Sequence, residues 1–328
     1  MHLEKAVEQL SEKKTLSEKE YEAAFREMTE GKNPDAAAVF LKLLSEKGET
    51  VEEFEGLARV MREKVIKIRA GKGLLDIVGT GGDGSNSVNI STGAALLAAA
   101  CGAKVAKHGS RASSSKCGSA DLLEAFGVSL EGDPIELLEE VGICFLFALK
   151  YHPAMKKVAP IRKKLGIRTI FNLAGPLVNP ANPDYFLLGV ARENLMELFA
   201  KVIQKLGIKR AFIVYGNGMD ELTPIGPCKI IDVTPDKMEK RVLEPEKLGL
   251  KKCVFSDLAG GDPETNKRLL LDAFQKGSGP IADTLVLNAG VGLYISEKVK
   301  TIEEGISLAR RTLKEGKVMD LLEKWRKR

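Results

Sequence analysis

The chain lacks paired cysteines and long hydrophobic runs. Its 328 residues include five cysteines, which lie far apart and form no C-x-x-C pair. This spacing argues against a zinc site or a disulfide framework and favours a reducing compartment. The longest apolar run, GAALLAAACGA at 93–103, is too short to span a bilayer, and the charged start MHLEKAVEQLSEKK has no hydrophobic signal-peptide segment. We therefore expect a cytoplasmic protein with no membrane partner.

Dense basic patches are also missing, although the formal net charge is +5. This mild positive balance suits anionic substrates but is not typical of a dedicated nucleic-acid binder, so no nucleic-acid partner is expected. With 44% hydrophobic and 29% charged residues, the chain can bury a large core, and its length allows two domains or one large domain with a satellite.

Two kinds of pattern divide the chain. Residues 1 to about 70 show helical spacing of apolar residues, including a capping box formed by Ser17 and Glu20. Elsewhere, short apolar runs alternate with helical stretches, which predicts a mainly parallel sheet. The predicted strands are LLDIV at 74–78, AKVAKHG at 103–109, GICFLFAL at 142–149, YFLLGVA at 185–191, RAFIVYGN at 210–217 and TLVLNAG at 284–290, with short strands or a hairpin within 228–250.

These patterns predict an α/β fold with two domains. A small all-helical domain is built from residues 1–70 with a helical excursion at 151–183. A large α/β domain with a mainly parallel central sheet is built from 71–150 with 184–328. Residues 1–70 show no candidate catalytic or binding motif.

One loop, GTGGDGSNSVNIST at 79–92, contains G-x-G-x-x-G at Gly79, Gly81 and Gly84. A dinucleotide fingerprint needs these glycines to open a helix and an acidic residue about 20 positions further on. Here the helix is expected to start near Ser91, and the second strand ends in Lys107 rather than in an acid. NAD binding is therefore disfavoured.

What remains is a glycine-rich bend whose backbone N–H groups can converge on an anion. Asp83 lies in its middle, and Asn89, Ser91 and Thr92 crowd a helix N-terminus suited to phosphate. The alternative is a tight strand-to-helix turn in which Ser91 or Thr92 is only an N-cap.

The next strand end favours the anion site. Residues 107–127 carry basic side chains and five serines, and one of these, Ser119, lies with Asp121 at an expected helix start. The basic residues are Lys107, His108, Arg111 and Lys116. In an open parallel sheet, ligands bind beyond the carboxyl ends of the strands, so two such loops predict a pyrophosphate site. A solvated charged loop is the alternative.

A third strand end supplies Asp220 and Glu221. Mg²⁺ is commonly held by one or two carboxylates together with substrate phosphates, so this pair is a candidate metal site, although a surface turn with unpaired acids is the alternative. His152 falls in the helical excursion, and Arg162 or Arg168 could grip an acidic acceptor through a fork to its carboxylate or simply pair with a surface glutamate.

Several motifs together resemble the anthranilate phosphoribosyltransferase family, in matching order over nearly the whole chain. They are GTGGD at 79–83, NxST at 89–92, KHGxR at 107–111, SSKxGSAD at 114–121, YHPAMK at 151–156, RxxLGIRTIFNLxGPLxNPA at 162–181 and MDE at 219–221. The resemblance implies the fold shared with nucleoside phosphorylases, a homodimer, and PRPP bound with Mg²⁺ between the two domains. It implies transfer of 5-phosphoribose to the amine of anthranilate, with release of pyrophosphate, in tryptophan biosynthesis.

The resemblance also implies roles for individual residues. PRPP would contact Gly79, Gly82, Asp83, Asn89, Ser91, Thr92, Lys107 and Ser119. Magnesium would be held by Ser91, Asp220 and Glu221. Anthranilate would be lined by Gly79, His108, Ser110, His152 and Arg162, with Arg162 addressing its carboxylate. No side chain is implied as a general base, because the acceptor amine already carries a free lone pair.

One departure from the family pattern concerns the acceptor. The motif usually reads KHGNR, whereas this chain has Ser110 at the asparagine position. Two other functions fit the same architecture. A pyrimidine nucleoside phosphorylase would carry a Lys-His-Ser-Thr-Gly-Gly type of phosphate loop, which differs from Gly-Thr-Gly-Gly-Asp here. A non-catalytic nucleic-acid-binding relative would not need the Asp220–Glu221 pair or Arg162.

Overall fold

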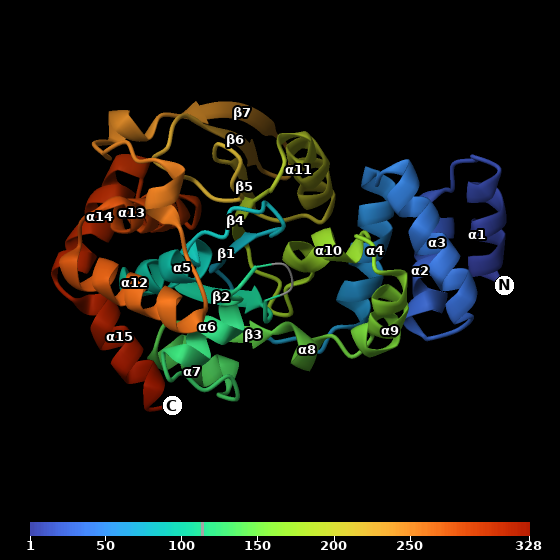
Figure 1. The fold of residues 1–328 in the computed structure, drawn as a ribbon, viewed down its shortest axis with the longest axis horizontal. Helices are drawn as coiled ribbons and strands as arrows, with labels where there is room; N and C mark the ends of the chain where they lie inside the picture. The colour runs from blue at the N-terminus through green and yellow to red at the C-terminus, as the bar shows by residue number, and fades with distance from the viewer. Residues whose placement is uncertain (113–114) are drawn as a thin grey trace. The chain divides into compact units, whose positions relative to one another are not determined.

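The computed structural model describes residues 1–112 and 115–328, which form two compact units. A helical unit comprises residues 1–67 with 148–180, and an α/β unit comprises 68–147 with 181–328. Ser113 and Ser114, two of the serines in the predicted anion site, lie outside the described residues. Over the described residues, no helix combines the length and apolar character needed to cross a membrane. Figure 1 labels the elements of both units.

Four helices at the start of the chain form the main part of the helical unit. The capping box of Ser17 and Glu20 is present and opens the second helix, while Pro34 opens the third behind an Asn33 cap. Phe25 and Phe40 pack edge to face inside the unit, with ring centroids 5.4 Å apart. Its elements are α1 (His2–Ser11), α2 (Glu18–Thr29), α3 (Pro34–Lys47), α4 (Val51–Lys64), α8 (Ala148–Tyr151), α9 (Met155–Leu165), α10 (Phe171–Ala174) and the 3-10 turn η1 (Gly175–Val178).

The α/β unit is built on a seven-stranded sheet in the order β3-β2-β1-β4-β5-β6-β7. Its first five strands are parallel, and β6 and β7 add an antiparallel hairpin at one side, which confirms the mainly parallel sheet. The strands are β1 (Leu74–Gly79), β2 (Lys104–Gly109), β3 (Ile143–Phe147), β4 (Tyr185–Gly189), β5 (Arg210–Tyr215), β6 (Cys228–Val233) and β7 (Met238–Leu243).

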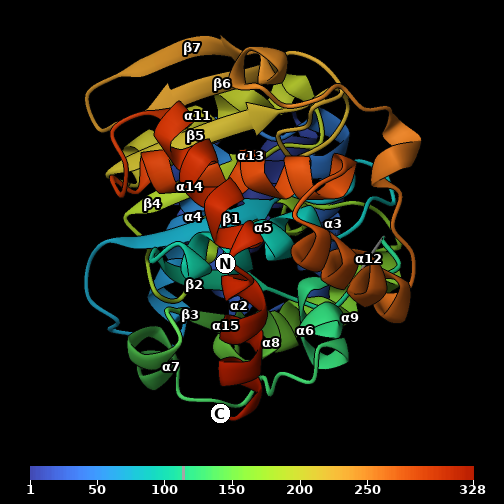
Figure 2. The ribbon, with the colours of Figure 1, turned by 90° about the vertical axis from the view of Figure 1, so that its left-hand side faces the viewer.

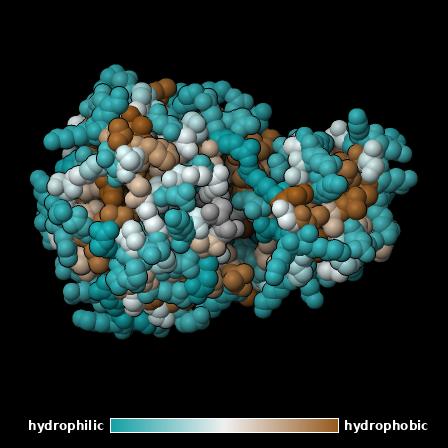
Figure 3. Space-filling model, viewed as in Figure 1, coloured by the Kyte–Doolittle hydropathy of each residue, from teal (hydrophilic) through white to brown (hydrophobic). Residues whose placement is uncertain are grey.

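Helices lie in several connections of this sheet and make up the C-terminal part of the chain, as Figure 2 shows, and four 3-10 turns occur among the described residues. The face of the α/β unit seen in Figure 3 mixes many hydrophilic residues with smaller apolar groups, as is normal for a folded protein surface. The elements are α5 (Ile90–Ala100), α6 (Ser119–Ala125), α7 (Pro134–Glu140), η2 (Glu193–Leu195), α11 (Met196–Lys205), η3 (Pro245–Leu248), η4 (Phe255–Leu258), α12 (Pro263–Lys276), α13 (Pro280–Ile295), α14 (Ile302–Lys314) and α15 (Lys317–Arg326).

One prediction about local structure was wrong, and one alternative weighed for the loop at 79–92 does not hold. The stretch 284–290, predicted to be a strand, lies inside α13, which is buried on nearly all sides. A continuous apolar run cannot distinguish a buried helix from a buried strand by its periodicity, and here the close contact of α13 with α5 at Gly93 favours the helix. In addition, Asn89 rather than Ser91 or Thr92 caps α5, since its side chain accepts from the N–H of Thr92.

The strand order places a switch point between β1 and β4. The chain proceeds from β1 outward through β2 to β3, returns to β4 on the other side of β1, and continues outward to β5. Right-handed crossovers then put the connecting helices α5 and α11 on opposite faces of the sheet. Ligands of open α/β sheets bind beyond the carboxyl ends of the strands at such a point, so the loops after β1, β2 and β5 share one edge.

Candidate active site of the α/β unit

The glycine-rich loop after β1 has a backbone that only glycine adopts easily. Gly81, Gly82 and Gly84 have φ values of 67°, 79° and 74°, in the left-handed region. Between them, Asp83 Oδ1 accepts hydrogen bonds from the N–H and the hydroxyl of Ser85. This local turn holds the Asp83 side chain in a fixed direction, so the loop is more than a linker to α5.

The loop after β5 begins with a tight two-residue turn. Asn217 and Gly218 have φ values of 58° and 95°, and Gly216 and Met219 exchange backbone hydrogen bonds across them. Two successive positive φ values with Asn-Gly at the centre are typical of a type I′ turn. The Asn-Gly pair is a sequence signal for this turn that was not among the predictions. The turn reverses the chain just before Asp220.

Two glycines form the slot in which Asp220 lies. Gly79 and Gly189 are paired in register at the ends of β1 and β4. A β-carbon on Gly79 would be 2.2 Å from Asp220 Oδ2, and one on Gly189 would be 1.5 Å from the Asp220 carbonyl oxygen. The N–H of Gly81 donates to the same Oδ2 at 2.6 Å. Gly79 therefore makes room for an acidic side chain, and Gly189 is a residue of this site that the sequence analysis missed.

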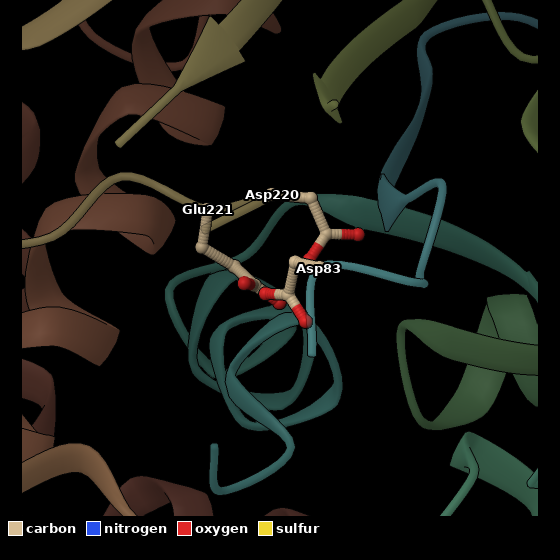
Figure 4. Close-up of side chains that lie close together, drawn as sticks. All are labelled: Asp83, Asp220 and Glu221. Atoms are coloured by element: carbon tan, nitrogen blue, oxygen red, sulfur yellow. The ribbon is translucent and has the colours of Figure 1, made fainter. Parts of the chain in front are cut away.

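Three carboxylates converge beyond the switch point. One oxygen from each of Asp83, Asp220 and Glu221 can be chosen so that all lie within 4.8 Å of one another. Figure 4 shows the three side chains lying close together. Burial, and then the charge of Asp83, raise the pKa of Asp220 above its usual range. Burial, and then the charge of Asp220, do the same for the pKa of Glu221. The predicted pair, Asp220 and Glu221, thus lies together with Asp83 in one acidic cluster.

This cluster fits a hard divalent cation. Asp83 Oδ2 and Glu221 Oε2 are buried and have no hydrogen-bond partner among the described residues. Buried oxygens of this kind are costly unless a proton or a cation satisfies them. Carboxylate oxygens at the end of a phosphate-type loop are the ligands that Mg²⁺ prefers, whereas no histidine or cysteine of the described residues joins the cluster.

Lys107 places a buried positive charge on the neighbouring strand. Its side chain is 1% exposed, and its ammonium group donates to the carbonyl of Ile77 at 2.8 Å and to the hydroxyl of Ser91 at 3.4 Å. Burial lowers the pKa of Lys107, while the charges of Asp76 and Glu221 oppose that shift. The predicted residues Lys107 and Ser91 therefore lie together between β1 and the start of α5.

The start of α5 is anchored from a distant part of the chain. The N–H of Asn89 donates to Oδ1 of Asn266, a residue of α12 that is 1% exposed. The side chain of Asn89 accepts the N–H of Thr92 and donates to the carbonyl of Cys117. The hydroxyl oxygen of Thr92 is buried without a partner among the described residues. The helix N-terminus and the loop after β2 are thereby joined.

The predicted residues of the loop after β2 differ in burial and in their partners. Ser119, the first residue of α6, lies against the end of β2, since a β-carbon on Gly109 would be 3.1 Å from that of Ser119. His108 is buried in β2, and Ser110 is exposed. Arg111, which was expected to add positive charge for an anion, forms ion pairs with the acids of α6. These ion pairs connect the loop to α6.

Two acceptor candidates belong to the helical unit. His152 is 3% exposed, and burial lowers its pKa to about 4. Arg162, on α9, has its guanidinium 5.8 Å from the ring centroid of Phe171. Burial also lowers the pKa of Arg162, and its Nε is buried without a hydrogen-bond partner among the described residues. A half-buried guanidinium with an unused donor suits a carboxylate ligand.

The two units correspond to two halves of a known protein class. Residues 4–65 match the model described as "Glycosyl transferase family, helical bundle domain", and residues 71–319 match "Glycosyl transferase family, a/b domain". The fold is thus that of a glycosyl transferase with a helical bundle and an α/β domain.

Individual relatives narrow the class. The chain is 44% identical over 314 residues to an anthranilate phosphoribosyltransferase of Chlamydia felis, covering 94% of this chain and 92% of the relative. The solved enzyme of Thermus thermophilus is 43% identical, with a TM-score of 0.91 and 98% of both chains covered. That of Saccharomyces cerevisiae in complex with PRPP and Mg is 27% identical, with a TM-score of 0.88 and coverage of 98% and 96%. This chain belongs to the anthranilate phosphoribosyltransferase family.

Proposed function

We propose that this chain transfers the 5-phosphoribosyl group of PRPP to the amine of anthranilate, with Mg²⁺, and releases pyrophosphate. This reaction is a step of tryptophan biosynthesis. The observation that carries the proposal is the convergence of Asp83, Asp220 and Glu221 from two loops beside a glycine-rich anion loop. Family membership supports it, since the yeast relative was solved with PRPP and Mg.

The PRPP site is proposed at the carboxyl edge of the sheet. The loop with Gly82 and Asp83, the N-terminus of α5 at Asn89, Ser91 and Thr92, and the side chains of Lys107 and Ser119 would bind its phosphates and ribose. The free N–H groups of a helix N-terminus and of a glycine-rich bend attract phosphate. Burial lowers the pKa of Lys107, the charges of Asp76 and Glu221 oppose that shift, and the negative charge of a bound pyrophosphate would further favour the charged ammonium group.

Ser91, Asp220 and Glu221 are proposed to hold magnesium, and Asp83 is near enough to join them directly or through water. A bound Mg²⁺ supplies positive charge for the pyrophosphate that leaves the anomeric carbon. The protein itself holds the carboxylates together: Gly79 and Gly189 leave room for Asp220, and the N–H of Gly81 orients its carboxylate.

The acceptor is proposed to contact Gly79, His108, Ser110, His152 and Arg162. The guanidinium of Arg162 would grip the carboxylate of anthranilate, since its buried Nε has an unused donor. His152 remains neutral near pH 7 because burial lowers its pKa to about 4, so it can donate or accept a hydrogen bond but carries no charge. The anthranilate amine attacks with its own lone pair, and orientation supplies much of the rate.

We also propose a homodimer and the domain division 1–70 with 151–183 and 71–150 with 184–328. Light scattering on the purified protein would give twice the mass of one chain. Limited proteolysis would cut first near residues 68–72 or in the return near 181–184 if these are domain linkers. A monomer would contradict the first proposal, and initial cleavage inside β1 or α9 would contradict the second.

The reaction is tested by incubating the protein with PRPP, Mg²⁺ and anthranilate and following the fluorescent phosphoribosylanthranilate. Product is expected with anthranilate, and none after chelation of the metal. Phosphate-dependent cleavage of thymidine, in the absence of this product, would instead indicate a nucleoside phosphorylase. Absence of product together with tight binding of single-stranded DNA at moderate salt would indicate a binding protein.

A further inference from the structure

A buried asparagine on α13 contacts the loop that carries the acidic pair. Asn288 is 1% exposed and lies in the middle of the helix. Its Oδ1 accepts the N–H of Leu222 at 3.1 Å, and its Nδ2 donates to the carbonyl of Leu222 at 2.7 Å. Nδ2 also donates to the carbonyl of Thr284 at 2.9 Å, one turn back on α13. The side-chain amide of Asn288 thus forms three hydrogen bonds, and two of them bind the backbone N–H and carbonyl of Leu222.

Leu222 directly follows Asp220 and Glu221, so this grip fixes their chain direction. Asn288 accepts the N–H of Leu222, and this N–H and the carbonyl of Glu221 belong to the same peptide group. That carbonyl oxygen lies against Gly216, where a β-carbon would be only 2.1 Å away. The Glu221 peptide is therefore held from two sides, by Asn288 on α13 and by the close approach of Gly216.

The hydrogen bonds between Asn288 and Leu222 hold the acidic loop against electrostatic repulsion. Asp83, Asp220 and Glu221 repel one another when charged, and the loop would relieve this repulsion by moving outward. The turn at Gly216–Met219 fixes only the N-terminal side of the pair. The two hydrogen bonds to Leu222 fix the C-terminal side, from a helix that is itself buried.

We propose that Asn288 is a positioning residue that keeps the acidic pair in the geometry that binds a divalent cation. It acts through the backbone of Leu222 and does not touch the ligands. The inference rests on the proposed metal role of Asp220 and Glu221. A purely structural asparagine would affect folding stability alone, so metal affinity separates the two roles.

The test is a titration of the whole protein with Mn²⁺, with the free ion followed by electron paramagnetic resonance. Asn288→Ala is expected to weaken Mn²⁺ binding about tenfold, the effect of misplacing a group held by one or two hydrogen bonds. The concentration of Mg²⁺ needed for half-maximal turnover rises in parallel, whereas the KM for anthranilate changes little. Should this variant not fold, Asn288→Asp takes its place, because it keeps the acceptor for Leu222 and loses both donors.

Thr284→Val is the matched control. Thr284 is fully buried on the same helix, and its hydroxyl donates only to the carbonyl of Pro280. This variant loses a buried hydrogen bond on α13 without changing the contact with Leu222, so its Mn²⁺ affinity is expected to equal that of the parent. Equal Mn²⁺ affinity in the Asn288 variant and the parent overturns the inference, whatever happens to stability. Lack of transfer activity in the parent would refute the proposed function and leave this binding test intact.

Discussion

The carbonyl oxygen of Asp220 occupies the place where Gly189 would carry a β-carbon, 1.5 Å from its ideal position. Gly189 ends β4 opposite Gly79 of β1, so the acidic loop rests on two strand ends that lack side chains. A residue with no side chain thereby makes room for the backbone of a candidate metal ligand at the edge of the sheet.

Gly189→Ala is expected to displace the acidic loop. Backbone rather than a flexible side chain fills the space, so the added methyl group costs about 1–3 kcal/mol or more in unfolding free energy. Turnover at fixed Mg²⁺ falls as well. Leu188→Ala serves as the comparison, because this buried neighbour points to the opposite face of β4 and its loss costs a similar or larger amount, about 2–5 kcal/mol. Equal activity of both variants per folded molecule would refute the role of Gly189.

Asp220→Asn with Glu221→Gln is expected to abolish turnover while the protein stays folded. The neutral amides remove repulsion among three clustered carboxylates, so melting in metal-free buffer is unchanged or shifted upward. The rate falls by roughly a hundredfold or more, since a bound metal contributes several kcal/mol to such reactions. Thermal melting and the fluorescent assay measure the two effects. Glu264→Gln with Asp272→Asn, two acids on the exposed side of α12, should keep parental activity.

Arg162→Ala is expected to raise the KM for anthranilate about tenfold or more, because a charge-assisted hydrogen bond contributes about 1.5–3 kcal/mol. The KM for PRPP should change little. Initial-rate measurements with each substrate varied in turn distinguish these outcomes. Lys163→Ala removes the exposed charge next along α9 and should leave both constants unchanged. An unchanged anthranilate KM in Arg162→Ala would mean that another group holds the carboxylate.

Ser110→Asn restores the residue that the family motif usually has at this position. The longer amide adds a hydrogen-bonding group on the acceptor side, so the KM for anthranilate should fall about two- to tenfold. Ser110 is exposed, and its carbonyl, which accepts the N–H of Ala120, is unaffected by the substitution. Ser129→Asn, at an exposed position outside this loop, is the control. A KM that does not fall would show that the serine meets the needs of the acceptor in this chain.

His152 makes the helical unit sensitive to acid. Burial lowers its folded-state pKa from 6.5 to about 4, so the unfolded chain binds a proton at a pH where the folded chain does not. The resulting stability is fully present above pH 6.5 and is lost as the pH falls towards 4. The loss amounts to about 3 kcal/mol in unfolding free energy.

Urea unfolding of the parent and of His152→Gln between pH 4 and pH 7 measures this effect. The unfolding free energy of the variant should lack the part that depends on protonation of His152. The difference in unfolding free energy between the two proteins should therefore shrink as the pH falls. His2→Gln, at an exposed position in α1, should retain the acid dependence of the parent. A His152 ring signal in NMR that titrates near pH 6.5 would contradict the prediction.

Local sequence patterns determined much of this protein. Alternating short apolar runs and helices determined the mainly parallel sheet, because strand and helix periods differ and βαβ connections are right-handed. The capping box of Ser17 and Glu20 determined where α2 begins. The lack of an acid after the second strand disfavoured a dinucleotide site, and the glycine and acidic motifs pointed to phosphate and metal. The Asn217–Gly218 turn was equally visible.

Only the tertiary structure decided how these pieces meet. Local sequence could not assign 284–290 to a helix, because a continuous apolar run fits a buried strand as well as a buried helix. The packing of this segment against α5 is a tertiary contact. The partners of Asp220 are Gly79 and Gly189, which lie far from it in the chain, and the grip of Asn288 on Leu222 spans 66 residues. Sequence spacing carries no record of such contacts, because sheet order and helix packing create them. The residue types specified the chemistry of the site, and the switch point between β1 and β4 decided where three carboxylates converge.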